Sequence, residues 1–235
     1  MKFAIISAGE GSRLSQEGVC LPKPLVQLNG TAMIDRLIRI FTANGAEEIV
    51  VIINNEVPLT KAHLEELAQA SEVPLRVIVK TTPSSMHSFY ELSPYLKGER
   101  FCLTTVDTVF HEDEFARFIE AFKVSDTDGM MAVTDYIDDE KPLYIGTDDN
   151  LNITGFYDAA RTDTKYISGG IYCLAPRAID TLESCIRQGI SRMRNFQRQL
   201  VSDGLQLKAY PFSKILDVDH ADDIRKAEDF LNDKK

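Results

Sequence analysis

The residues best suited to chemistry lie near the start of the chain, in a glycine-rich turn that follows an apolar segment. Gly9 and Gly11 stand in this turn, and Arg13 follows it. Glycines let a backbone approach a ligand closely and aim its N–H groups at an anion. Lys23 comes a few residues later between two prolines, which favour an extended, restrained backbone. A glycine turn beside a restrained lysine predicts a phosphate-binding site.

Two familiar phosphate loops do not match these residues. A P-loop requires Gly-Lys-Ser or Gly-Lys-Thr at the start of a helix, and the chain lacks this sequence. The Rossmann fingerprint requires Gly or Ala at the position of Leu14, where leucine is too bulky for close helix–strand packing. The alternative interpretation is an ordinary strand–helix turn with a solvated lysine. This alternative explains the glycine turn or the lysine taken alone, but it explains their occurrence together less well.

Three carboxylates are candidates for holding a metal ion. Asp107 closes the apolar segment 101–106, and Asp219 precedes the last helical pattern. A lone acid at the end of a buried strand is costly to bury without a partner, and Mg²⁺ favours carboxylate oxygens. Asp217 would point to the same face of a strand as Asp219, so periodicity leaves both as candidates. The alternatives are a turn or capping role for Asp107 and a helix N-cap role for Asp219.

Strand and helix patterns alternate along the chain and must position these groups. Short apolar runs predict strands, and apolar residues at helical spacing predict the helices between them. Buried strands joined by helices form a three-layer α/β fold, with a mostly parallel mixed sheet flanked by helices. Open α/β sheets bind ligands beyond the carboxyl ends of their strands, which is where Asp107 lies. The predicted strands are 3–7, 49–53, 75–79, 101–106, 130–134, 166–174 and 215–218, and the predicted helices include 33–41, 64–68, 115–122, 179–186, 193–201 and 224–231.

Residues 136–164 differ from the rest of the chain because they are polar and rich in turn-forming residues. We interpret them as a β-meander that forms a small substrate-side lobe rather than a separate domain. Repeats, low-complexity tracts and linkers are absent from the sequence. Residues 1–235 are therefore interpreted as a single domain with a first part over about 1–135. The second part, with the closing strand and helix, occupies about 136–235.

The composition narrows the range of functions. The chain has 235 residues, 44% of them hydrophobic, and a formal net charge of −10. This charge argues against a nucleic-acid partner, but a few local cations suffice to bind a small anion. The four cysteines lack metal-ligand spacing and indicate reduced thiols. Because no apolar run approaches the roughly 20 residues that span a bilayer, we expect a cytoplasmic protein without a membrane partner. The sequence leaves open whether it forms a homo-oligomer.

At these residues the chain resembles the nucleotide-sugar pyrophosphorylase-like nucleotidyltransferases, which have a GT-A-like α/β fold. Their opening signature, Ala-Gly-x-Gly-x-Arg followed by Pro-Lys-x-Leu, is matched by residues 8–13 and 22–25. Residues 101–107 resemble the family's strand that ends in a metal-binding aspartate. Residues 216–224 resemble its Asp-Val-Asp-Thr-Pro-Glu-Asp-Leu segment, and 168–172 resemble its acceptor-side Asn-Ala-Gly-Ile-Tyr strand. The resemblance therefore extends over almost the whole chain.

The resemblance implies transfer of a nucleoside monophosphate from a nucleoside triphosphate to a sugar 1-phosphate or a similar small phosphomonoester. Pyrophosphate would leave, and Mg²⁺ would be the cofactor. A phosphomonoester has a second pKa near ~6, so its oxygen is already an anionic nucleophile and needs no general base. The implied catalytic residues are Arg13, Lys23 and Asp107, and the implied metal ligands are Asp107 and Asp219. The implied nucleotide-binding residues are Ala8, Gly9, Glu10, Gly11, Ser12, Arg13, Lys23, Thr82 and Ser85, with Gly170 on the acceptor side.

Three departures from the family pattern affect these expectations. Val106 replaces a frequent glycine before the metal aspartate, and His220-Ala221 replaces Thr-Pro, which removes the usual helix cap. The serine-rich stretch 81–88 is similar to that of relatives that activate alcohol phosphates such as phosphocholine or inositol phosphate. The alternative functions are therefore activation of such an alcohol phosphate, a glycosyltransferase of GT-A-like fold, and a non-catalytic sensor of nucleotide or sugar phosphate.

Overall fold

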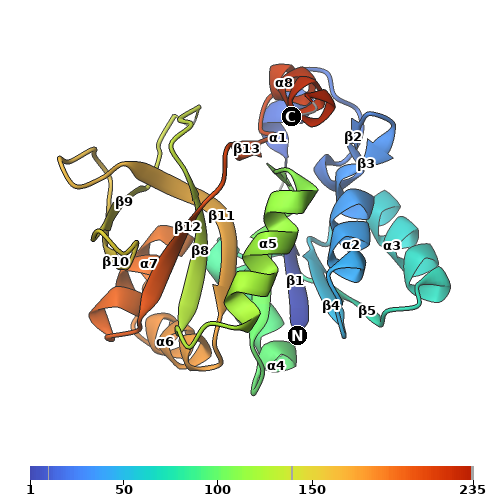
Figure 1. Cartoon of the computed structure of the whole chain (residues 1–235). Coiled ribbons are helices and arrows are strands. Elements are labelled where there is room, and N and C mark those ends of the chain that lie inside the picture. The colour runs from blue at the N-terminus through green and yellow to red at the C-terminus, as the bar shows by residue number, and fades with distance from the viewer. Residues whose placement is uncertain (10, 139, 234–235) are drawn as a thin grey trace.

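A nine-stranded sheet runs through the centre of the molecule in the described residues, 1–9, 11–138 and 140–233, of the computed structural model (Figure 1). Its main path has the order β10-β9-β11-β6-β1-β4-β5, and β8 pairs with β11 and with β12. Neighbouring strands β5, β4, β1 and β6 run parallel, whereas β11 is antiparallel to β6, β8 and β9. The strands are β1 (Lys2–Ser7), β4 (Ile49–Ile53), β5 (Leu75–Val79), β6 (Phe101–Thr105), β8 (Gly129–Thr134), β9 (Tyr144–Thr147), β10 (Ile153–Tyr157), β11 (Tyr166–Leu174) and β12 (Leu207–Pro211).

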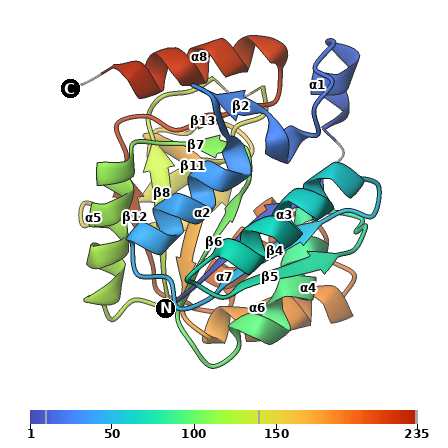
Figure 2. The ribbon, with the colours of Figure 1, turned by 90° about the vertical axis from the view of Figure 1, so that its right-hand side faces the viewer.

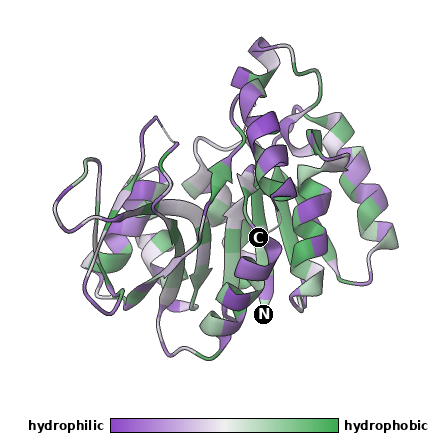
Figure 3. Ribbon diagram, turned by 45° about the horizontal axis from the view of Figure 1, so that its top comes forward, coloured by the Kyte–Doolittle hydropathy of each residue, from purple (hydrophilic) through white to green (hydrophobic). Residues whose placement is uncertain are grey.

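Helices cover both faces of this sheet, because successive side chains of a strand point to opposite faces. On β1, Phe3 and Ile5 are fully buried against one layer of helices, and Ala4 and Ile6 are buried against the other. Apolar residues concentrate along the central strands, and the helices carry polar residues on their outer sides (Figure 3). The first layer includes α2 (Met33–Ala43), α3 (Pro58–Ala70) and α5 (Glu112–Lys123), and the second includes α4 (Ser85–Leu96), α6 (Arg177–Arg187) and α7 (Met193–Ser202). This three-layer fold, a mixed sheet between two layers of helices, is as predicted.

The carboxyl ends of β1 and β6 lie at the same edge of the sheet, since the two strands are parallel neighbours. Shorter elements gather above this edge. They are α1 (Ser12–Gln16), a 3₁₀ turn (Lys23–Leu25), the hairpin of β2 (Gln27–Leu28) and β3 (Thr31–Ala32), and a small sheet of β7 (Thr108–Val109) and β13 (Leu216–Asp217). The last helix, α8 (Ala221–Asn232), lies across the top of them, with α1 near its start (Figure 2). Segments from both ends of the chain therefore meet at the carboxyl edge of β1 and β6.

The structure adds a helix that the sequence patterns did not predict, and it extends the predicted meander. Helix α4 begins inside the serine-rich stretch and contains Pro94, so its apolar residues are separated by residues typical of turns. Its Met86, Phe89 and Leu92 are nevertheless fully buried. The polar stretch after β8 forms β9 and β10, and β9 pairs with β11, so the predicted meander continues the main sheet. No helix within the described residues combines the length and apolar character needed to cross a bilayer.

Gly170 of β11 is a position where the backbone requires glycine. Its φ is +73°, and a Cβ placed there would lie 3.2 Å from Thr108 Oγ1. We expect Gly170→Ala to lower the free energy of unfolding by about 1–3 kcal/mol, through left-handed strain and crowding. Gly189 is the matched control, since its φ is +70° and a Cβ there meets no described atom within 4 Å. Urea denaturation of the two variants should show the larger loss for Gly170→Ala, and equal losses would exclude a contribution from the Thr108 contact.

Candidate active site

A cavity of about 460 Å³ opens at the carboxyl edge of β1 and β6. It collects the described nucleotide-binding candidates together with the lysine and both candidate metal carboxylates. Glu10 alone among these candidates lies outside the described residues. The residues that line the cavity are Ile6, Ser7, Ala8, Gly9, Gly11, Ser12, Arg13, Lys23, Pro24, Thr82, Pro83, Ser84, Ser85, Ser88, Thr105, Val106, Asp107 and Asp219.

Gly11 brings the glycine turn against Lys23. Its φ is +61°, a left-handed conformation that favours glycine, and a Cβ there would lie only 3.0 Å from Lys23 Cβ. A larger residue at this position would push Lys23 away. The turn is supported from β4, because the buried Asn54 side chain donates from Nδ2 to the Gly9 carbonyl oxygen at 3.4 Å.

Lys23 begins a 3₁₀ turn, which corrects the expectation of an extended backbone at this residue. The turn closes because the Leu25 N–H donates to the Pro22 carbonyl oxygen at 2.8 Å, a local bond that outweighs the preference of a residue before proline for extended geometry. Pro22 itself is extended, with φ −54° and ψ 140°. The prolines therefore restrain Lys23 as predicted, but in a turn.

The Lys23 ammonium lies between the two candidate metal carboxylates. Its Nζ is 2.5 Å from Asp107 Oδ2 and 2.6 Å from Asp219 Oδ1. The lysine side chain is only 11% exposed. Burial alone would lower the pKa of Lys23, but the charges of Asp107 and Asp219 outweigh it, so the pKa lies above its ordinary value. Lys23 is therefore a charged lysine whose ammonium group is shared by two carboxylates.

Backbone hydrogen bonds fix Asp107 directly after β6. The Val106 N–H donates to the Ile6 carbonyl oxygen at 3.0 Å, and the Val218 N–H donates to the Asp107 carbonyl oxygen at 3.1 Å. The second bond ties this turn to the residue just before Asp219. Asp107 Oδ2 faces Lys23, whereas Asp107 Oδ1 is buried without a hydrogen-bond partner among the described residues. A buried carboxylate oxygen without a hydrogen-bond partner can still accept a contact from a cation.

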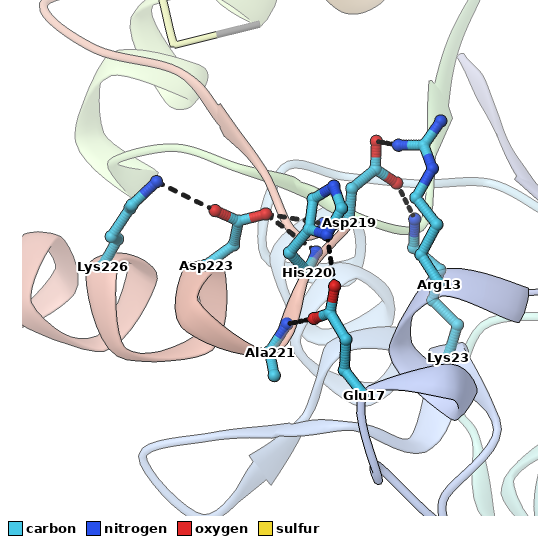
Figure 4. Close-up of polar contacts among 8 residues, drawn as sticks. All are labelled: Arg13, Glu17, Lys23, Asp219, His220, Ala221, Asp223 and Lys226. Carbon is cyan, nitrogen blue, oxygen red and sulfur yellow. Dashed lines mark hydrogen bonds and ion pairs between the residues drawn. The ribbon is translucent and has the colours of Figure 1, made fainter. Parts of the chain in front are cut away.

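Asp219 contacts two cations from the beginning of the chain. Besides Lys23, Arg13 Nη1 lies 2.9 Å from its Oδ2 (Figure 4). Burial would raise the pKa of Asp219, but the nearby Lys23 and Arg13 hold it below its usual range. The N-cap of α8 is His220, so Asp219 precedes the cap and is not the cap itself.

The start of α8 is capped from within the helix by Asp223 and from outside it by Glu17. Glu17, which follows α1, accepts a hydrogen bond from the Ala221 N–H at 2.7 Å and lies 2.6 Å from His220 Nδ1 (Figure 4). The hydrogen bond between their side chains lowers the pKa of Glu17 and raises that of His220. Asp223 accepts the N–H groups of His220 at 2.8 Å and of Asp219 at 3.2 Å. Together Glu17 and Asp223 replace the threonine cap that this sequence lacks.

Comparison with known families decides the class of this site. A family model, the MobA-like NTP transferase domain, matches residues 3–203. The chain belongs to this family. As predicted, it is a nucleotidyltransferase.

Individual relatives of this NTP transferase are distant in sequence. The chain is 24% identical over 187 residues to the mannose-1-phosphate guanylyltransferase catalytic subunit beta of Dictyostelium discoideum. That alignment covers 78% of this chain and 52% of the relative, so the chain spans about half the length of the curated relative it matches.

Solved structures of nucleotidyltransferases share the fold. The inositol-1-phosphate CTP transferase from T. maritima superposes with a TM-score of 0.81 and 18% identity, covering 99% of this chain and 96% of that chain. The CTP:phosphocholine cytidylyltransferase from Streptococcus pneumoniae gives a TM-score of 0.72 and 19% identity, covering 98% and 99%. At these identities the likeness establishes the fold alone.

A second cavity of about 350 Å³ adjoins the first in the NTP transferase. Arg13 and Asp219 line both cavities, and Asp217 lines the second. Ser168 and Gly169 of β11 also line the second cavity, whereas their neighbour Gly170 faces Thr105 and Thr108. The second cavity carries acidic and basic side chains together, with Tyr136 at its wall.

Sequence reasoning missed four contributors to this region. Asn54 could have been found, because it is a polar residue directly after a buried strand, the same signal that identified Asp107. Ser88 was visible only as part of the serine-rich stretch; its Oγ lies 2.6 Å from Thr82 Oγ1 inside the first cavity. Ser7 lines the same cavity at the end of β1, and its buried Oγ has no partner among the described residues. Glu17 had no local signal, since its partners lie at the other end of the chain.

The position of Lys23 makes a testable electrostatic prediction. Removing the ammonium leaves Asp107 and Asp219 facing each other with less compensation. We expect Lys23→Met to lower the free energy of unfolding by about 1–3 kcal/mol, because Lys23 and Asp107 are mostly but not fully buried. The measurement is urea denaturation in EDTA. Lys97→Met is the control, because Lys97 forms an exposed ion pair with Glu183 at 2.6 Å and should lose little. Equal losses in the two variants would contradict a special role of the buried contact.

Proposed function

We propose that the chain transfers a nucleoside monophosphate from a nucleoside triphosphate to a sugar 1-phosphate or a similar small phosphomonoester, releasing pyrophosphate. The observation that carries this proposal is Lys23, held between Asp107 and Asp219 beside a glycine turn and a cavity of about 460 Å³. A triphosphate needs cations and backbone N–H groups, and a metal-dependent transfer needs carboxylates. All three are present at one edge of the sheet.

The two carboxylates fit Mg²⁺, which is coordinated by few protein carboxylates and completes its shell with substrate oxygens and water. Asp107 and Asp219 would hold the ion. The buried Asp107 Oδ1, without a described hydrogen-bond partner, supports this assignment. When bound, Mg²⁺ supplies positive charge to the triphosphate and to the departing pyrophosphate. No group of three or more His, Cys, Asp or Glu side chains among the described residues is placed to hold a metal ion.

The chain's own cations would stabilise the negative charge of the transfer. Lys23 would contact the α-phosphate, where charge builds during the displacement, and Arg13 with the N–H groups of the glycine turn would hold the β- and γ-phosphates. The acceptor phosphate is already ionised and attacks the α-phosphorus without a general base. In the structure Lys23 and Arg13 contact the carboxylates. Substrate binding would therefore exchange these partners.

The second cavity is the proposed acceptor site, because it shares Arg13 and Asp219 with the first. On this assignment residues 1–135 bind the nucleotide, and 136–235 supply the acceptor side and the closing strand and helix. An alcohol phosphate such as phosphocholine or inositol phosphate is the alternative acceptor. The similarity of the serine-rich stretch to that of relatives that activate alcohol phosphates supports it. Two of the structural relatives act on such acceptors by name.

The deciding experiment pairs four triphosphates with a panel of sugar 1-phosphates, phosphocholine and inositol phosphate. Pyrophosphate is measured with Mg²⁺ and with EDTA. A nucleotidyltransferase releases pyrophosphate only when the correct pair and Mg²⁺ are present. A glycosyltransferase consumes a nucleotide sugar without releasing pyrophosphate, and a sensor binds its ligand without turnover. Either of these results would overturn the proposal.

Asp107→Ala should abolish turnover while the protein stays folded. The substitution removes a metal carboxylate, and loss of this stabilisation is expected to lower kcat by about 10²-fold or more. Asp113→Ala is the matched control, because Asp113 pairs with Arg117 at 2.9 Å on the exposed side of α5. Pyrophosphate release and thermal melting should be measured on both variants. Near-normal Mg²⁺-dependent activity in Asp107→Ala would remove Asp107 from the site.

Asp219, rather than Asp217, is the proposed second metal ligand. Asp219 contacts Lys23 and Arg13, whereas Asp217 lies opposite Thr108 in the β13–β7 pair. Asp219→Asn should raise the Mg²⁺ concentration for half-maximal activity by about tenfold or more, and Asp217→Asn should change it much less. The two variants are titrated with Mg²⁺ and melted in EDTA. A larger shift for Asp217→Asn would transfer the role to that residue.

A further inference from the structure

Helix α1, which follows the glycine turn, is connected to the start of α8 by side-chain contacts. Arg13 and Glu17, one turn apart on and just after α1, both reach the segment 219–221 at the other end of the chain. Arg13 contacts the carboxylate of Asp219, whereas Glu17 contacts only the His220 ring and the Ala221 N–H (Figure 4). Arg13 therefore holds the side chain of Asp219, whereas Glu17 holds the two residues that follow Asp219.

This difference matters for the exchange of partners described above. If Arg13 and Lys23 turn to the triphosphate, the Asp219 carboxylate loses both of its cations. The Glu17 contacts do not involve that carboxylate, so they persist through the exchange. Asp223 acts in the same sense from inside the helix, because it accepts the Asp219 N–H at 3.2 Å and is itself paired with Lys226 at 3.1 Å. The backbone at Asp219 is thus fixed on both sides.

We propose that Glu17 is a positioning residue that keeps Asp219 in place for Mg²⁺ and couples it to the triphosphate-binding turn. This inference rests on the proposed function. Residues that orient a metal ligand without touching the ion typically change metal affinity by 10–100-fold when removed. A purely structural role would instead appear as lost stability. The Glu17 side chain is 38% exposed and that of His220 39%, so their ion pair should contribute little to global folding.

The chain offers a matched control in Glu114. Its carboxylate accepts the Ser213 N–H at 2.9 Å and the Ser213 hydroxyl at 2.9 Å. Like Glu17, it joins a helix to the C-terminal segment through a backbone N–H and a side chain. It lies in a different hollow, with His111 and Arg117. If tethering this segment were enough, removal of either glutamate would have the same effect.

The experiment compares wild type, Glu17→Ala, Glu17→Gln and Glu114→Ala. In a Mg²⁺ titration of pyrophosphate release, Glu17→Ala should raise the half-saturating Mg²⁺ concentration by about tenfold. Glu17→Gln keeps an oxygen acceptor for the Ala221 N–H and should recover part of the loss. Glu114→Ala should match wild type, and all four should melt within a few degrees of one another. An unchanged Mg²⁺ requirement in Glu17→Ala, or an equal rise in Glu114→Ala, would overturn the inference.

A second measurement separates this inference from the proposed function. Binding of Mn²⁺ in the presence of inorganic tripolyphosphate, followed by electron paramagnetic resonance, requires no turnover and no choice of base. Glu17→Ala should weaken Mn²⁺ binding by about the same tenfold factor. If wild type binds Mn²⁺ this way but releases no pyrophosphate with any substrate pair, the proposed function fails and the positioning role stands. If Glu17→Ala binds Mn²⁺ as wild type does, the positioning role fails whatever the activity.

Discussion

The contact of Lys23 with Asp107 and Asp219 is the constraint on which the arrangement of the site depends. Two carboxylates this close together repel each other and need a shared cation. Lys23 can provide it because Gly11 allows the backbone to approach and the 3₁₀ turn aims the side chain inward. Asp107 arrives from the end of β6 and Asp219 from beyond β13. The neutralising lysine therefore connects three segments that are far apart in the sequence.

The C-terminal segment completes a site that the family-matched region begins. The match to the MobA-like NTP transferase domain ends at residue 203, before β12, β13 and α8. Yet Asp219 lies in the later segment, held beside Asp107 by the bond from the Val218 N–H. The pairing of β13 with β7 gives this segment a fixed register against the turn after β6. The family-matched region thus supplies Lys23 and Asp107, and the later segment supplies Asp219.

Much of the fold could be predicted because buried strands leave a strong local signal. Each predicted strand from 3–7 to 166–174 overlaps an observed one, because short apolar runs favour strands. Most of these strands are buried, but β5 at the edge of the sheet has only half-buried and exposed residues. Helix α4 was missed because serines and Pro94 interrupt its pattern, and α1 because five residues carry too little periodicity. At the site, Lys23 and Asp107 were visible from residue type and position. The contacts of Glu17 were not, because they join residues about 200 positions apart and depend on the completed fold.

The charges of the site can be paired in two ways. In the structure two cations, Lys23 and Arg13, contact two acids, Asp107 and Asp219. These contacts give the mostly buried Lys23 and Asp107 charged partners, and so avoid the cost of burying either charge alone. On the proposed function, a metal ion takes the acids and a triphosphate takes the cations, so neither group is left alone. Groups that never change partners must then keep the geometry constant. Asn54 behind the glycine turn and Glu17 behind Asp219 are in that position, since each bonds to backbone and not to the exchanging charges.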